Sequence, residues 1–401
     1  MKKCNFVLLV LFIFIVSCSQ NTENSVKSNV SKVNNFDEKS LDDILTLPIT
    51  FSDKEYTLEK VKEINIPIDS VSQNWSKYPV YYDADTTQYY IQGNEAIHSI
   101  DFYDLDRKTL YKRIKLEKTG TEAIHSVTKF FIKNIDSIYI FETGHGKINL
   151  VDNEGHILAH YSLPQKYMFN VSTSMTSNFS IYGDKAYFTS DMFSGLHISE
   201  VTEKLIKGKK MVAVFDLNTE QLDFTEPQIP IYLASEKLPI SLFGCSSHFS
   251  NEIFLQQTNF TGIIYHSKNK KDYQQTLLHR KGFLNEEAKK SRRGDNGIVY
   301  DNHFLILADK KSNLFYSVIL EGIEEKDLDG KPNSYNDRPI TIVIADENFH
   351  HAGEITLPKD THFRNVMATR DGLLVSNANP KNPNNDEGAL SFTLYKPKKI
   401  K

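Results

Sequence analysis

The sequence has few cysteines, no long apolar segment and no excess of positive charge. Three cysteines in 401 residues are too few for a disulfide framework, so the folded part must be stabilised by its core. The longest apolar run covers residues 6–16, whereas a membrane-spanning helix needs about 20 residues. The formal net charge of −4 at pH 7 argues against nucleic acid as a partner, because nucleic-acid-binding domains carry a basic surface.

Several common catalytic motifs are also missing. There is no GxSxG, HExxH or CxxC motif and no DxDxDG calcium loop. Gly144-His145-Gly146 is predicted to be a turn rather than a phosphate loop, because no helix follows it. We therefore expect no catalytic residues, no metal ligands and no cofactor, and we favour a protein that is not an enzyme.

The first eighteen residues have the order of an export signal. Lys2 and Lys3 precede the eleven apolar residues 6–16, a length typical of signal peptides. The segment ends in Ile15-Val16-Ser17-Cys18, which resembles the bacterial lipobox. We predict a signal peptide at residues 1–17 and fatty-acyl chains on Cys18, which anchor the protein to a membrane. The alternative is an ordinary secretory peptide that is cleaved near a cysteine.

The segment after the predicted cleavage site is polar. Residues 18–48 are rich in Ser, Asn, Lys and Asp and have few large apolar residues before Leu41. Such a segment buries too little surface to offset its ordering entropy. We predict a flexible, lipidated spacer at residues 18–48 and a single domain at residues 49–401.

An internal repeat predicts the fold. Short apolar strands alternate with polar turns in six units, and the second strands begin near residues 87, 137, 185, 252, 303 and 372. A spacing of roughly 50 residues is typical of four-stranded propeller blades. The third strands end in a turn with Asp, as in FYDLDRKTL, LVDNEGHIL, VFDLNTEQL and VIADENFHHAG. We predict an all-β, six-bladed β-propeller; seven blades and a pair of β-sandwiches are the alternatives.

Two units depart from the pattern. The sixth unit has only three strands, so we predict that residues 55–68 pair beside residues 389–396 and close the ring. The fifth unit contains one strand too many. If residues 293–301 form its first strand, three segments remain for its third and fourth strands. Polar insertions at 191–210, 323–338 and 379–388 interrupt the repeat.

The lipobox, together with HSIDFYDLDRKTLYKRIKLEKTG and KINLVDNEGHILAHYSL, resembles a known family. It is the group of Bacteroidetes lipoproteins called domain-of-unknown-function family 4221, related to six-bladed, TolB-like propellers. The resemblance implies a propeller in the cell envelope and carries no activity or functional residues. Because Ser19-Gln20-Asn21 lacks the acidic run that directs such lipoproteins to the cell surface, we favour a periplasm-facing position on the outer membrane.

Propeller sites usually lie on the loops that join the outermost strand of one blade to the innermost strand of the next. By the predicted register these loops cover residues 117–126, 163–175, 230–242, 281–296 and 358–364. They supply the candidate ligand-binding residues His125, Asn170, Arg293, His362 and Arg364, and the histidines with neighbouring Arg and Glu side chains suit an anionic group or a metal. The simpler interpretation is that these residues are solvated loop side chains.

These observations favour a monomeric binding or scaffolding protein that is held at the membrane by lipid on Cys18. Its ligand is an envelope protein, a peptide or a glycan. One alternative is a hydrolase or lyase that acts on glycans or peptides at the channel mouth. It requires His125 and His362 on the same face of the ring. The other is a sensor that binds a small anion through Arg293 and Arg364.

Overall fold

The computed structural model describes residues 40, 43, 47–164, 171–172, 179–190, 202–228, 254–257, 262–267, 274–281, 298–299 and 301–400. The chain divides into two units, Met1–Val33 and Asn34–Lys401, and all of these residues belong to the second. The predicted signal peptide and Cys18 lie outside the described residues. Among the described residues, no helix is both long and apolar enough to cross a membrane.

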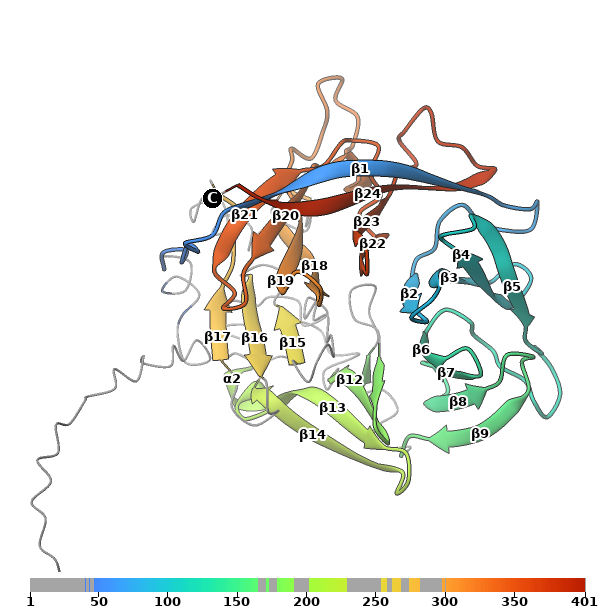
Figure 1. The fold of residues 1–401 in the computed structure, drawn as a ribbon. Coiled ribbons are helices and arrows are strands. Elements are labelled where there is room, and N and C mark those ends of the chain that lie inside the picture. Colours follow the sequence, from blue (N-terminus) through green and yellow to red (C-terminus); the bar gives the residue numbers. More distant parts are fainter. Residues whose placement is uncertain are drawn as a thin grey trace, which may run out of the picture. The chain divides into compact units, whose positions relative to one another are not determined.

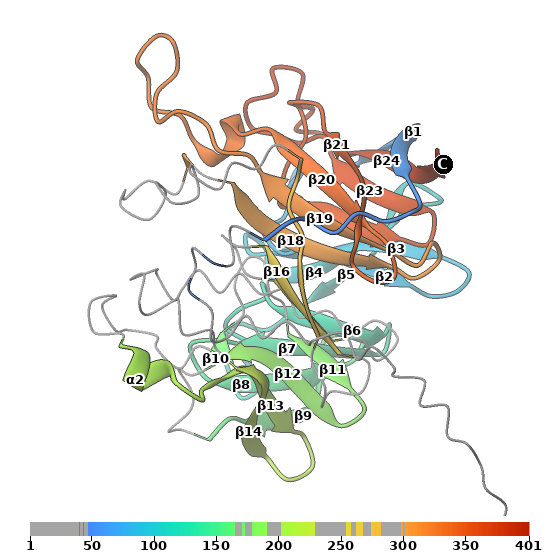
Figure 2. The same ribbon diagram turned by 90° about the vertical axis from the view of Figure 1, so that its left-hand side faces the viewer.

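The described strands form antiparallel sheets that are arranged as a propeller-like ring (Figure 1). Figure 2 shows the same sheets after a turn of 90°. Two blades come from the first half of the domain. One contains β2 (Val80–Asp83), β3 (Gln88–Asn94), β4 (Ser99–Asp104) and β5 (Thr109–Lys115). The next contains β6 (Phe130–Asn134), β7 (Ser137–Glu142), β8 (Lys147–Val151) and β9 (Ile157–Ser162). Both match the predicted units.

The middle of the chain supplies a five-stranded and a three-stranded sheet within the described residues. The first contains β10 (Val171–Ser172), β11 (Ser180–Tyr182), β12 (Lys185–Ser190), β13 (Lys210–Asp216) and β14 (Gln221–Gln228). A short helix, α2 (Glu203–Ile206), precedes β13. The second contains β15 (Phe254–Gln257), β16 (Ile263–Ser267) and β17 (Gln274–Leu277). The predicted first strand of this unit, residues 242–250, lies outside the described residues.

Two further blades complete the described part of the ring. One contains β18 (Asn302–Asp309), β19 (Leu314–Leu320), β20 (Ile340–Ala345) and β21 (His351–Thr356), with the 3₁₀ helix η6 (Tyr335–Asp337) before β20. The other contains β22 (Val366–Thr369), β23 (Gly372–Ser376) and β24 (Ala389–Lys399), together with β1 (Tyr56–Pro67). Of the described sheets, therefore, five have four or more strands.

The position of a strand in its blade explains its burial. Every residue of β19 and β20 is buried, because these middle strands are covered on both faces by neighbouring sheets. The outermost strand β9 alternates between half-buried and exposed residues, since only one of its faces packs inward. The innermost strands β18, β22, β2 and β6 lie beside one another in that order around the ring.

The predicted aspartate turns are confirmed. Asp104, Asp152, Asp216 and Asp346 each accept hydrogen bonds through Oδ1 from two backbone N–H groups two to four residues further on. Asp309 does the same between β18 and β19, where no such turn was predicted. The carboxylate replaces the ladder hydrogen bonds that the turn cannot make, which sets the hairpin register.

The predicted strand assignment is wrong in the fifth unit. The innermost strand is β18, not residues 293–301, of which the described residues 298, 299 and 301 are outside any strand. Each predicted strand of this unit is shifted by one place, because the blade was predicted to start before β18. With β18 first, the three segments that had to fill two places become β19, β20 and β21.

The predicted closure of the last blade is confirmed. β1 pairs antiparallel with β24, with Ile66 opposite Leu390 and Tyr56 opposite Lys399 (Figure 1). β1 also runs close to β21 of the neighbouring blade. A Cβ atom on Gly353 would lie 2.0 Å from the Tyr56 carbonyl oxygen, so only glycine permits this approach.

Candidate functional site

The loops that enter the innermost strands lie on one face of the ring. In a ring of four-stranded antiparallel meanders, each connection from an outermost strand to the next innermost strand crosses on the same side. The turn between the second and third strands of each blade lies on that side too. We call this side the mouth face; it carries residues 68–79 before β2, 116–129 before β6 and 357–365 before β22. His125 and His362 therefore share a face, as the hydrolase or lyase hypothesis requires.

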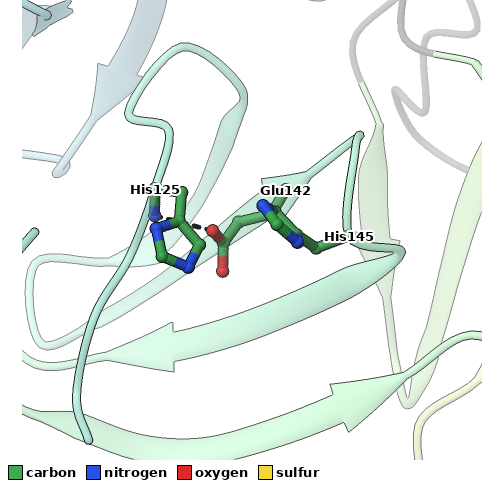
Figure 3. Close-up of side chains that lie close together, drawn as sticks. All are labelled: His125, Glu142 and His145. Atoms are coloured by element: carbon green, nitrogen blue, oxygen red, sulfur yellow. Dashed lines mark hydrogen bonds between the residues drawn. The ribbon is translucent and has the colours of Figure 1, made fainter. Parts of the chain in front are cut away.

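The mouth face brings His125 together with two residues of the β6–β9 blade. Glu142 ends β7, and His145 lies in the turn that leads to β8. One ligand atom from each of the three residues lies within 4.8 Å of the others (Figure 3). The two imidazole rings are exposed and their centroids are 4.6 Å apart, whereas Glu142 is buried.

Hydrogen bonds hold the Glu142 carboxylate in place. Its Oε2 accepts from the backbone N–H of His125 at 2.6 Å, and its Oε1 accepts from Asn149 Nδ2 at 2.6 Å. Asn149 Oδ1 in turn lies 2.7 Å from Nδ1 of His160, which fixes the orientation of the amide. The carboxylate therefore has donors, but no ion pair with Lys or Arg, in the part of the chain that the structure describes.

A second group lies where β22 and β2 begin. The ring of Trp75, the one tryptophan of the sequence, stacks on His362 with centroids 5.0 Å apart and planes at 29°. His362 lies beside Phe363, with ring centroids 5.5 Å apart. Burial, helped by the charge of Arg364, lowers the pKa of His362 to about 4. This buried imidazole is therefore neutral at pH 7 and packs between aromatic rings, of which Trp75 is partly exposed.

Three basic side chains, Lys77, Lys129 and Arg364, lie near Tyr78 on the same face. Lys129 Nζ lies 3.3 Å and Lys77 Nζ 5.3 Å from the Tyr78 ring centroid. Burial, with the nearby charge of Lys77, lowers the pKa of Lys129 to about 6. Burial also lowers the pKa of Arg364, whose guanidinium carbon lies 5.2 Å from the Phe363 ring. Among the described residues, neither Lys77 nor Arg364 has a carboxylate partner.

A cavity of about 450 Å³ adjoins this surface. Trp75 and Asn74 line it together with residues of the β1–β2 connection and of the β23–β24 loop, namely Ile68, Asp69, Ser70, Ser72, Gln73, Glu387 and Gly388. Its lining combines one aromatic ring with short polar side chains.

The β1–β2 connection is fixed by side chains of the neighbouring blade. Arg113 Nη1 donates to Asp69 Oδ2 at 2.7 Å, and its Nε donates to the buried Asp101 at 2.9 Å. Gln92 Nε2 donates to the Gln73 carbonyl at 2.9 Å, and Asn94 Nδ2 to that of Val71 at 2.7 Å. The backbone that presents Trp75 is therefore held by several independent contacts.

The structure places three of the five candidate ligand-binding residues. His362 and Arg364 lie in the Trp75 group, and His125 lies in the Glu142 group, two different parts of the mouth face. Asn170 and Arg293 lie outside the described residues. The sequence reasoning missed Glu142, because it reads as the end of a buried strand, and His145, because it reads as a turn residue. Lys129 stands directly before the innermost strand β6. A search of the positions directly before each innermost strand could have found the Tyr78 group.

Comparison with known proteins gives the family. The model of a domain of unknown function (DUF4221) matches residues 55–291. The chain belongs to the DUF4221 family. The predicted membership is confirmed, and the family name assigns no activity. No curated protein sequence matches this DUF4221 chain.

Two solved structures resemble this DUF4221 protein. A DUF4221 member from Bacteroides vulgatus ATCC 8482 superposes with a TM-score of 0.72 at 17% identity, over 87% of this chain and 100% of that chain. A putative exported protein from Bacteroides fragilis NCTC 9343 has a TM-score of 0.47 at 11% identity, over 88% and 98% of the two chains. At these identities the likeness shows the fold alone.

Proposed function

We propose that this protein is an envelope lipoprotein that binds a ligand with an anionic group at the mouth face of a six-bladed propeller. The lipid anchor on Cys18 is supported by the order of lysines, apolar run and cysteine in the sequence. The sixth blade is supported by the three strands β15–β17, to which the apolar residues 242–250 would add a fourth.

One observation carries the binding proposal: Arg364 and Asn365 follow each other before β22, and within the described part of the chain the Arg364 guanidinium has no carboxylate partner. Asn365 is completely buried, and among the same residues neither its amide oxygen nor its amide nitrogen has a hydrogen-bond partner. A buried polar group without a partner costs about 1–3 kcal/mol, so native structures seldom keep one without a reason. An anion at this place would pair with the guanidinium and accept from the amide.

The surroundings favour an anion that is attached to a larger apolar or cyclic body. Lys77 and Lys129 lie around the Tyr78 ring, and Arg364 acts on the same ring, so basic side chains gather where β2, β6 and β22 begin. An anion bound there would raise the pKa of Lys129 and Arg364 again, because a nearby negative charge favours the protonated forms. The stacked Trp75 and the adjoining cavity supply an aromatic surface beside the charge.

The test is capture of the intact lipoprotein from mildly cross-linked native membranes, followed by identification of what accompanies it. The wild type is compared with Arg364→Gln and with the control Arg107→Gln, whose side chain is 77% exposed in the β4–β5 turn. We expect one stoichiometric envelope component that is lost at high salt and in Arg364→Gln but kept in Arg107→Gln. A component that Arg364→Gln retains fully, or no component at all, contradicts the proposal.

The hydrolase or lyase hypothesis is the second candidate, and the convergence of His125, Glu142 and His145 favours it. Two imidazoles beside a fixed carboxylate can move protons or hold an electrophilic centre. Turnover of a glycan or peptide by the wild type that disappears in His145→Ala would support an enzyme. Unchanged turnover in that variant would exclude this cluster as the reacting centre.

A further inference from the structure

The three side chains around Glu142 form a ligand set for one metal ion. We propose that His125, Glu142 and His145 bind a divalent transition-metal ion of the zinc type. The ligand atoms lie within 4.8 Å of one another, whereas ligands of one tetrahedral zinc ion lie about 3.3 Å apart, given bond lengths of about 2.0–2.1 Å. Both imidazoles are exposed and lie beside the Glu142 carboxylate (Figure 3). Metal binding requires their side chains to rotate until the remaining distance is closed.

The fixed member of the set is the carboxylate. Glu142 is buried, and its two oxygens are aimed by the His125 backbone N–H and by Asn149 Nδ2. Each oxygen keeps a second lone pair for a metal ion. Asn149 and His160 form the outer layer of support that metal-binding carboxylates commonly have.

The position of His125 is fixed as well. His98 Nε2 lies 2.5 Å from the Ile124 carbonyl oxygen, which ties the residue before His125 to the β3–β4 turn. The backbone N–H of His125 is bound to Glu142 itself. The loop therefore presents the imidazole next to the carboxylate whether or not the ring is bound to anything.

Charge favours a divalent ion at this point. Of the described residues, no Lys or Arg forms an ion pair with Glu142, so no side-chain cation there competes with a metal ion for the carboxylate oxygens, whose contacts are the two hydrogen-bond donors. Two neutral imidazoles and one carboxylate around a dication leave a net charge of +1. The exposed side of the cluster leaves the remaining coordination positions to water or to a ligand.

The donor set selects the kind of metal. Imidazole nitrogens suit Zn²⁺, Cu²⁺, Ni²⁺, Co²⁺ and Fe²⁺, whereas Mg²⁺ and Ca²⁺ require oxygen ligands. Two nitrogens and one oxygen with open positions resemble the three-ligand sets of zinc and non-haem iron centres. We therefore expect binding of Zn²⁺ and Co²⁺, and none of Mg²⁺.

The experiment is a titration of the full chain without a histidine tag, treated with chelator and purified in detergent. Zn²⁺ affinity is measured by calorimetry, and Co²⁺ is added as a probe whose visible absorption reports its ligands. The variants are His145→Ala and His125→Ala, in which the backbone donor to Glu142 remains. Glu142→Gln is a third variant, and far-ultraviolet circular dichroism checks that each one is folded. The control is His156→Ala, an exposed histidine in the β8–β9 turn.

We expect one Zn²⁺ per chain, an absorption band with Co²⁺, and binding at least about 100-fold weaker in His125→Ala and His145→Ala, since even outer-layer changes cost about 10–100-fold. His156→Ala should bind as the wild type does. Equal affinity of wild type and His145→Ala would overturn the proposal even if Glu142→Gln failed to fold. So would an affinity for Mg²⁺ that equals the affinity for Zn²⁺.

Discussion

Ile66 lies opposite Leu390 in antiparallel register, although one residue is near the start of the domain sequence and the other is near its end. Both are completely buried in one cluster with Tyr90 and Phe392. We predict that Ile66→Ala lowers the free energy of unfolding by about 2–5 kcal/mol, because it leaves a cavity in this cluster. The control Val61→Ala, at a residue of β1 that is 47% exposed, should change it by less than about 0.5 kcal/mol. Equilibrium unfolding in denaturant measures both values.

Gly353 offers a second test of the same closure. A methyl group at this position would lie 2.0 Å from the Tyr56 carbonyl oxygen, so β1 or β21 must move. We predict that Gly353→Ala lowers the melting temperature strongly, with a loss of about 3 kcal/mol. Gly144→Ala, where nothing lies within 4 Å of the added atom, should leave it unchanged. Equal melting temperatures would mean that β1 does not approach β21 in solution.

Arg113 is expected to stabilise the protein through Asp101. The Asp101 side chain has no exposed surface, and Arg113 donates to both of its oxygens at 2.9 and 3.0 Å. We predict that Arg113→Leu costs about 3–5 kcal/mol, because it leaves the buried Asp101 carboxylate without its charged partner. The neighbouring Lys112→Leu, which breaks the more exposed pair with Glu154, should cost about 1 kcal/mol or less.

The double variant Arg113→Leu/Asp101→Leu tests whether the loss of stability comes from the unpaired Asp101 charge or from lost packing around the Arg113 guanidinium. If the unpaired charge is the cause, removing Asp101 as well recovers part of the stability. A double variant that is less stable than Arg113→Leu alone would show that packing around the guanidinium matters more. The comparison is a double-mutant cycle of unfolding free energies.

The fold is expected to lose stability in mild acid through buried histidines. His279 Nδ1 lies 3.2 Å from His303 Nε2, and both rings are buried. Burial, together with the charge of Arg280, lowers the pKa of His303 to about 3. Burial and the neighbouring His303 lower the pKa of His279 well below its ordinary value, against the opposing charge of Asp301.

The direction in which stability changes with pH depends on whether the folded or the unfolded chain binds more protons. With folded pKa values below 6.5, the unfolded chain takes up more protons between about pH 6.5 and pH 3, so stability is complete above pH 6.5 and falls below it. At pH 5 the burial of neutral His303 costs about 2 kcal/mol, and His279 adds to the loss in the same direction. Unfolding curves from pH 7.5 to pH 5 should show this loss, and His303→Gln should reduce it, whereas His156→Gln should not. A flat profile would contradict the burial of the pair.

The repeat in the sequence predicted much of the fold, because blade strands alternate with short turns whose chemistry is local. The Asp residues at 104, 152, 216 and 346 each hold a turn by their own side chains, so a single segment of sequence was enough to find them. The pairing of residues 55–68 with residues 389–396 followed from counting strands in the last unit. The error in the fifth unit arose because apolar spacing alone does not show which of several successive segments is the first strand of a blade.

The candidate site was less predictable. His125 was proposed from its place before an innermost strand, but its partner Glu142 comes from a different part of the blade and carries no local signal. Trp75 and His362 are far apart in sequence and meet only because β2 and β22 are neighbours in the ring. Such contacts depend on the closed arrangement rather than on any one segment.

The pairing of β1 with β24 also sets the order in which the molecule can be completed. A growing chain that has not yet produced residues 389–399 leaves the long strand Tyr56–Pro67 without its neighbour, and with it a free row of backbone donors and acceptors. Long-range pairings of this kind form late and slowly during folding. Until β24 is in place, β1 is therefore an open sheet edge to which a strand of another copy can add, and addition of β24 removes that risk of aggregation.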